Sequence, residues 1–216
     1  MEAVTPFIFA GFTGASIIIS GIFLYLNFRE KLVTYRLFAL IAFIFAIDCA
    51  FSVFMLSKGY RTEPDLIGWT RPLIFVYGPL FFLTFSIITG YNSKVRADHV
   101  LHFLPFATHF MLMIPFILKT PATKIFLYEH YVKGVAYIEY YPHFMMFMKV
   151  LFFFIYSLIP FVLTRKYSKM VREFYSTIDN VKIVKMYVIS IAYLLSSVVL
   201  IHIFYGYLTG PSFIRP

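Results

Sequence analysis

Charged side chains are scarce in this chain, and the acidic ones are the scarcer kind. Only 13% of the 216 residues are charged, and ten are Asp or Glu, whereas soluble domains average roughly 25% charged residues. Cysteine occurs once, as Cys49, so no disulfide can form within the chain. These shortages argue against a soluble domain and against a disulfide-stabilised one.

Motifs that carry chemistry are also missing. The sequence has no glycine-rich phosphate loop, no His-Glu-x-x-His, no Cys-x-x-Cys and no Gly-x-Ser-x-Gly. His102 and His109 lie two helical turns apart, about 10 Å, which is too far for both to bind one metal ion. We therefore expect no enzymatic activity, no metal site and no cofactor.

Long apolar stretches fill most of the chain. Hydrophobic residues make up 61% of the sequence, and the mean hydropathy is +0.81. A bilayer core about 30 Å thick needs about 20 apolar residues as a helix. The stretches that reach this length are, roughly, 7–27, 37–57, 72–90, 100–118, 142–164 and 186–208. The sequence thus predicts an all-α, six-span transmembrane bundle that forms a single domain over residues 1–216.

The loops between these spans differ in basic residues, and the difference predicts the topology. Cytoplasmic loops carry an excess of Lys and Arg. One set of loops holds Arg29, Lys31, Arg36, Lys94, Arg96, Arg165, Lys166, Lys169, Arg172, Lys182 and Lys185. The other set is longer and holds Lys58, Arg61, Arg71, Lys119, Lys124, Lys133 and Arg215. We expect a multi-pass protein of the cytoplasmic membrane with its N-terminus outside and the first set inside.

The net charge of +9 is explained by these loops and by anionic lipid, so no nucleic-acid binding is expected from these residues. Six spans return the C-terminus to the outside. The segment 210–216 resembles a loop that leads to another crossing, so one expectation is that these are the first six of seven spans.

Two loops contain more than connecting residues. Residues 124–141 mix apolar and tyrosine side chains, which suits an interfacial anchor or a lid over an outward-facing pocket. The basic segment 165–185 interleaves Met170, Val171 and Phe174 with its charges. That pattern suits a helix that extends from the fifth span, or one that lies on the inner leaflet.

Ionisable residues inside the spans are the candidate ligand-binding or switch residues, because burying a charge in hydrocarbon is costly. They are Asp48, Lys149, His109 and His202. The two histidines could also be neutral packing residues, and Lys149 could extend to the interface. Asp48 and Lys149 lie at similar depths, differing by roughly 4 Å. We therefore predict an Asp48–Lys149 ion pair inside the bundle.

Glycine and proline punctuate the spans. Proline removes a backbone donor and kinks a membrane helix. The predicted kink positions are Gly78, Pro79, Pro105, Pro115 and Pro160. In the first span, Ala10, Gly14 and Gly21 share a face that allows close helix packing, which leaves a homodimer open.

Two motifs carry a family resemblance. Residues 77–90 read Tyr-Gly-Pro-Leu-Phe-Phe-Leu-Thr-Phe-Ser-Ile-Ile-Thr-Gly, and residues 99–106 read His-Val-Leu-His-Phe-Leu-Pro-Phe. This region resembles the N-terminal membrane part of bacterial membrane-anchored AraC-type regulators, in which a Gly-Pro-Leu third span and a His-x-Leu-Pro-Phe fourth span recur. In that family, seven spans precede a cytoplasmic helix-turn-helix domain. The present chain contains no such domain, so DNA binding cannot be assigned to any of its residues.

The resemblance implies a sensory membrane module. A family of membrane histidine-kinase sensors has a similar layout, so the kind of output domain stays open. We expect a non-enzymatic domain that binds a small or lipid-like ligand among the outer halves of its spans. A small transporter or proton-coupled carrier is the alternative, and a lipid-modifying enzyme is the third possibility.

Overall fold

The computed structural model describes residues 5–91, 95–132, 142–174 and 180–209, and these residues form helices without strands. The α-helices are α1 (Thr5–Glu30), α2 (Val33–Leu56), α3 (Ile74–Ile88), α4 (Leu104–Ile117), α5 (Pro121–Val132), α6 (Pro142–Phe174) and α7 (Asn180–Thr209). Short 3-10 helices connect them: η1 (Gly59–Arg61), η2 (Pro64–Leu66), η3 (Arg71–Leu73) and η4 (Ala97–Phe103).

Five helical segments are long and apolar enough to cross a bilayer. They are Thr5–Glu30, Val33–Leu56, Pro64–Ile88, Ala97–Ile117 and Phe144–Glu173. The predicted all-helical architecture is therefore confirmed. Several apolar helices of this length are typical of a membrane-embedded protein. Within the described residues, the apolar part of α7 is Ile183–Val199, which is shorter. The sixth crossing stays a prediction, as do the identity of the membrane and the orientation in it.

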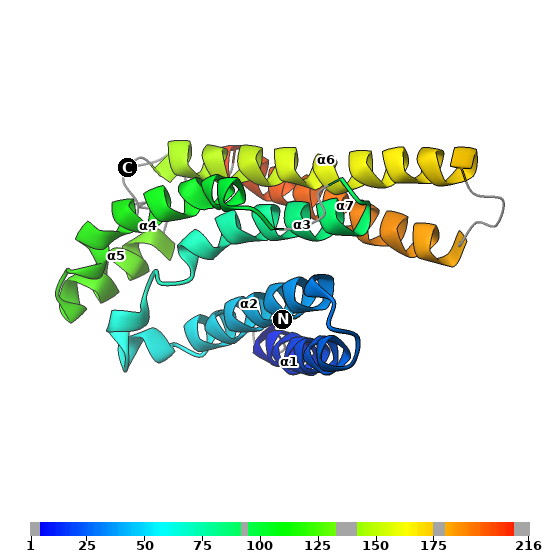
Figure 1. Ribbon diagram of the computed structural model, residues 1–216. Helices are drawn as coiled ribbons and strands as arrows, with labels where there is room; N and C mark the ends of the chain where they lie inside the picture. The colour runs from blue at the N-terminus through cyan, green and yellow to red at the C-terminus, as the bar shows by residue number, and fades with distance from the viewer. Residues whose placement is uncertain (1–4, 92–94, 133–141, 175–179, 210–216) are drawn as a thin grey trace.

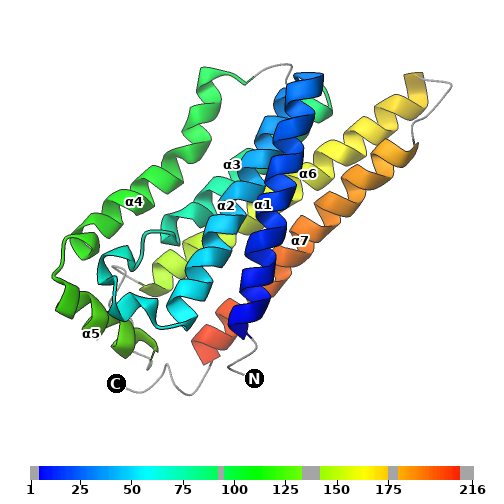
Figure 2. The same cartoon turned by 90° about the horizontal axis from the view of Figure 1, so that it is seen from below.

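The helices form two hairpins with α3 between them. Helices α1 and α2 pack antiparallel along their lengths, as do α6 and α7, and α3 contacts both α2 and α6 (Figure 1). In Figure 2, the C-terminal ends of α1, α3 and α6 lie at one end of the bundle, and α5 lies at the other. The helices thus alternate in direction as the sequence predicts, and the ends of α1 and α6 that carry basic residues lie together.

Helix α3 is the most deeply buried segment of the bundle. Its residues Phe85, Thr84 and Ser86 have no exposed surface. By contrast, α1 exposes large apolar side chains such as Phe7, at 78%, and Ile18, at 64%. Since lipid solvates apolar side chains as well as a protein core does, this exposure is the normal state of a membrane helix.

Small polar side chains join α6 to α7. Ser157 donates a hydrogen bond to Ser197 at 3.2 Å, and Thr164 bonds Ser190 at 3.3 Å. Small residues let two membrane helices approach closely, and their hydroxyls add hydrogen bonds between the helices. Helix α6 then continues through the basic segment to Phe174. Of the two alternatives for that segment, the structure forms the extension of the fifth span.

A small cap closes the end of the bundle opposite these basic ends. The cap consists of η1, η2 and α5, whose apolar side chains pack with α4 around Tyr60, Ile67, Met113 and Phe116. Gly68 has φ +91°, and a Cβ there would lie 2.9 Å from the Met113 methyl group. Both the backbone angle and this close approach require glycine.

Ion pairs join the 3-10 helices of the cap to α5. Arg61 pairs with Glu129 at 2.8 Å, and Lys124 pairs with Asp65 at 2.5 Å. The hydrogen bond from Arg61 to Glu129 raises the pKa of the guanidinium above its ordinary value. Residues 124–132 of the tyrosine-containing segment 124–141 belong to helix α5. Residues 133–141 lie outside the described part of the chain.

Three of the four prolines predicted as kinks lie inside helices, and Pro105 lies at a helix start. Pro79 and Pro160 lie inside α3 and α6, and Pro115 lies near the end of α4. Pro105 lies in the first turn of α4, after the 3-10 helix η4. A missing N–H costs nothing there, so Pro105 begins a helix and is not a kink within the span.

Candidate functional site

The intramembrane acid Asp48 has a defined partner on the neighbouring helix. The Tyr77 hydroxyl on α3 donates a hydrogen bond of 2.5 Å to the Asp48 carboxylate on α2. One turn earlier on α2, Ile44 packs against Val76 and Leu80 of α3. Because residues four apart share a helix face, the packing of Ile44 brings Asp48 to the same face of α3.

The predicted Asp48–Lys149 ion pair is not among the ion pairs of the described residues. Lys149 is buried on α6, at 8% exposure. Helix α3 lies between α2, which carries Asp48, and α6, which carries Lys149 (Figure 1). Similar depth in the membrane stays a prediction, and depth alone does not identify neighbouring helices.

The two histidine candidates lie in different environments. His109 is buried on α4 with its ring 5.3 Å from that of Phe75. His202 is exposed on α7. The four predicted site residues therefore lie on four helices, and the structure unites Asp48 with Tyr77, a residue that the sequence reasoning did not select.

A second polar site forms where η4 meets α3, α6 and α7. We call His99, His102, Tyr156 and Tyr193 the histidine–tyrosine cluster. The Nδ1 atom of His102 lies 2.6 Å from the Tyr156 hydroxyl, and the His99 and His102 rings are 6.3 Å apart. The Phe82 ring of α3 contacts both histidines, at 5.8 and 4.6 Å.

The sequence contained a partial signal for this cluster. His99 and His102 have the i, i+3 spacing of one helix face, but their tyrosine partners lie more than fifty residues further along the chain. The histidine that lies beside His102 is His99, and not His109, whose spacing from His102 the sequence analysis considered for a metal site. In the described part of the chain, no group of three His, Cys, Asp or Glu residues could hold a metal ion.

Gly78 connects the two polar sites. A Cβ at this position would lie 2.6 Å from Cγ of Tyr156, so glycine is needed for the tyrosine ring of α6 to rest on α3. The preceding residue, Tyr77, contacts Asp48 on the side of α3 that faces α2. Adjacent residues of α3 thus contact α2 and α6, and Pro79 follows them inside the helix.

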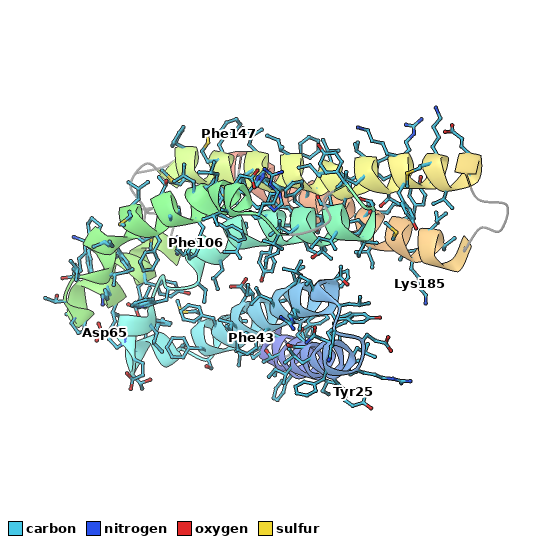
Figure 3. The ribbon with its side chains drawn as sticks, viewed as in Figure 1. Tyr25, Phe43, Asp65, Phe106, Phe147 and Lys185 are labelled. Carbon is cyan, nitrogen blue, oxygen red and sulfur yellow. The ribbon has the colours of Figure 1, made fainter. Side chains whose placement is uncertain are left out.

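Figure 3 shows the side chains along the bundle, and six of them are labelled. Phe43 of α2 and Phe106 of α4 lie part-way along the length of the bundle, while Asp65 and Lys185 lie toward its two opposite ends. On the outer surface of α1, Leu24, Tyr25, Phe28 and Arg29 line a shallow, apolar depression. That depression has none of the convergent polar groups that define a specific small-molecule site, and we do not assign it a role.

Comparisons of this chain with protein-family models, with curated proteins and with solved structures find no match. The assignment of a function therefore depends on the two polar sites.

Proposed function

We propose that the chain is a non-enzymatic sensory module of the membrane. It binds a small or lipid-like ligand near Asp48 and passes the change to a cytoplasmic output domain. The observation that carries this proposal is the Asp48–Tyr77 hydrogen bond, which joins the α1–α2 hairpin to the rest of the bundle.

A carboxyl group in this position suits a switch. An acidic side chain within a span is costly and stays there only with a partner. Tyr77 supplies one donor, whereas a carboxylate can accept several hydrogen bonds. A ligand with an amine or hydroxyl group can therefore compete with Tyr77 for Asp48. Displacing Tyr77 would loosen the contact between α2 and α3.

The contacts of α3 provide a route for the change. A shift of Tyr77 moves its neighbour Gly78, on which the Tyr156 ring rests. Tyr156 in turn bonds His102 of η4, at the end of the bundle where α6 extends as a basic helix. Pro79 interrupts the backbone hydrogen bonds of α3 beside these contacts, which eases a local bend of the helix.

The resemblance to the AraC-type membrane part supports the same reading. Gly78 and His102, which carry part of the two resembling motifs, both contact Tyr156. In this proposal the role of the two motifs is to couple α3, η4 and α6. The output is a helix-turn-helix or kinase domain attached to the membrane module.

Amphiphiles with matched chains test the ligand site. The full chain in lipid nanodiscs is heated with dodecylamine, dodecanol or dodecanoic acid, and the unfolding temperature is measured. A ligand that binds the folded state raises this temperature. We expect the amine or the alcohol to raise it by a few degrees in the wild type and not in Asp48→Asn.

The control variant is Asp98→Asn, which removes an exposed acid of η4 and should keep the response. An equal response of Asp48→Asn and wild type to all three amphiphiles, or no response of the wild type, would contradict the proposal. Uptake of a probe amphiphile into proteoliposomes, driven by a pH gradient, would instead support the carrier alternative.

A further inference from the structure

Helix α6 continues well past the end of its apolar span. It has 33 residues, which make about 50 Å of helix, whereas the hydrocarbon core of a bilayer is about 30 Å thick. Thr164, the last residue of the predicted span, is buried and bonded to Ser190 of α7. Figure 1 shows the α6–α7 hairpin extending past the end of α3. We call residues 165–174 the α6 extension.

One side of the α6 extension is turned toward α7. Ser168 and Val171 of the extension are buried, and so are Ile183 and Met186 in the facing part of α7. Because residues three and four apart share a helix face, Ser168 and Val171 continue the buried stripe that begins at Thr164. This packing fixes the rotation of the extension about its own axis, and it therefore decides which side chains point outward.

Basic side chains cover an outward face of the α6 extension. Arg165, Lys169 and Arg172 have the i, i+4, i+7 spacing of one helix face, and all three are exposed. At 100° per residue, this face lies about a quarter-turn away from the buried stripe. The acid of the extension, Glu173, pairs with Lys169 at 3.8 Å between exposed side chains. Arg165 and Arg172 form no ion pair within the described part of the chain.

We propose that this face of the α6 extension binds the phosphate groups of anionic phospholipids. Arg165 directly follows the span, so it lies at the level of the headgroups. Arg172 is about 10 Å further along the helix, and a long basic side chain can bend back toward the membrane interface. A guanidinium group also matches the oxygens of a phosphate with two parallel hydrogen bonds. Bound headgroups would hold α6 at a fixed depth in the bilayer.

The position of these charges favours lipid as the partner. An anionic leaflet attracts a basic segment that directly follows a membrane span, and the basic face begins at the first residue after Thr164. The bilayer surrounds the bundle wherever the protein is inserted, so headgroups are always within reach of this face. The proposal therefore holds for either orientation of the chain in the membrane. An acidic segment of another protein has the same charge as the lipid, and the experiment below distinguishes the two partners.

The test measures lipid binding to the full chain by native mass spectrometry. The protein in a neutral detergent is titrated with phosphatidylglycerol, and with phosphatidylcholine of the same acyl chains as the neutral reference. We expect phosphatidylglycerol to bind more tightly, and raised salt to weaken this preference because ions screen exposed charges. In Arg165→Gln/Arg172→Gln the preference should fall about 5- to 25-fold, since each basic residue near an anionic surface strengthens binding about fivefold.

Matched variants separate this face from basic charge in general. Lys58→Gln/Lys119→Gln removes two exposed basic side chains at the opposite end of the bundle, and it should keep the lipid preference. Arg165→Lys/Arg172→Lys keeps the charge and should retain most of the preference. Glu173→Gln removes the acid of the extension and should strengthen the binding of phosphatidylglycerol. This gain tests the proposal even if the double glutamine variant of the extension does not fold.

Three results would each overturn the proposal. The first is equal affinity of the wild type for the two lipids, and the second is an equal loss of preference in Arg165→Gln/Arg172→Gln and Lys58→Gln/Lys119→Gln. The third is binding of polyglutamate that Arg165→Gln/Arg172→Gln abolishes without losing its lipid preference, which would make the extension a protein-binding site. The experiment does not involve a ligand at Asp48. Its failure leaves the proposed sensory function standing, and failure of the amphiphile experiment leaves the lipid site standing.

Discussion

The Tyr77 hydroxyl of α3 donates a 2.5 Å hydrogen bond to the Asp48 carboxylate of α2. Tyr77 and Gly78 are adjacent, yet one contacts α2 and the other supports Tyr156 of α6. Successive residues of an α-helix point about 100° apart, so a single turn of α3 can contact both neighbours. Asp48 and Tyr156 therefore contact two consecutive residues of α3.

Removing the Tyr77 hydroxyl should destabilise the bundle. In Tyr77→Phe the Asp48 carboxyl loses a donor in an apolar environment, and we expect the free energy of unfolding to fall by about 1–3 kcal/mol. Thermal unfolding in detergent measures the effect. The control is Tyr35→Phe, because Tyr35 lies on α2 and stacks with Phe23. Equal stability losses in the two variants would argue against a special role for the Asp48 bond.

Asp48→Asn and Lys149→Met should have additive effects on stability. The two residues lie on α2 and α6, on either side of α3, and the ion pairs among the described residues do not include them, so the double variant should equal the sum of the single ones within about 0.3–0.5 kcal/mol. A double-mutant cycle read by thermal unfolding measures this. A large coupling energy would show that the ion pair predicted from the sequence forms after all.

A methyl group at Gly78 should be poorly tolerated. In Gly78→Ala the new Cβ meets the Tyr156 ring at 2.6 Å, and overpacking of this kind costs about 1–3 kcal/mol. The matched control is Gly14→Ala on α1, where a new Cβ meets nothing within 4 Å. We expect this control to be neutral or slightly stabilising, because alanine favours the helix more than glycine does.

The Lys124–Asp65 pair should matter to the cap more than the exposed Arg29–Glu30 pair matters to α1. The Lys124 side chain is 3% exposed, so Asp65→Asn leaves a buried ammonium without its carboxylate, which is more harmful than replacing the lysine itself. Hydrogen exchange of α5 should therefore accelerate more in Asp65→Asn than in Lys124→Met. Glu30→Gln should leave exchange in α1 nearly unchanged, since exposed pairs contribute about 0–1 kcal/mol.

The predicted topology can be tested by cysteine labelling in intact cells. The single native cysteine is buried and is replaced by serine in the background. Lys169→Cys then introduces a thiol at a position whose side chain is 80% exposed on α6, and Lys58→Cys introduces one at the other end of the bundle. We expect an impermeant reagent to label position 58 and not 169. Strong labelling at 169 would reverse the orientation.

Much of the local structure followed from the residues alone. Five of the predicted spans coincide with long apolar helical segments, since a run of about 20 apolar residues with few charges has one stable form in lipid. For the basic segment the sequence left two alternatives, a helix on the inner leaflet and an extension of the fifth span, and the structure forms the extension. Asp48 was singled out because an acid in hydrocarbon must find a partner.

The tertiary structure decided what that partner is. These helices are apolar on nearly all sides, and lipid is as apolar as a protein core, so the hydrophobic pattern does not show which face meets another helix. The position of α3 between the hairpins gave Asp48 the hydroxyl of Tyr77 in place of the ammonium of Lys149, and gave His102 the hydroxyl of Tyr156. Such contacts depend on which helices become neighbours, and side-chain packing over the whole bundle decides that. Gly78 is an example, because the missing side chain lets Tyr156 of α6 rest on α3. The sequence by itself therefore predicted a lipid environment and the helices. The packing determined the Asp48–Tyr77 and His102–Tyr156 contacts.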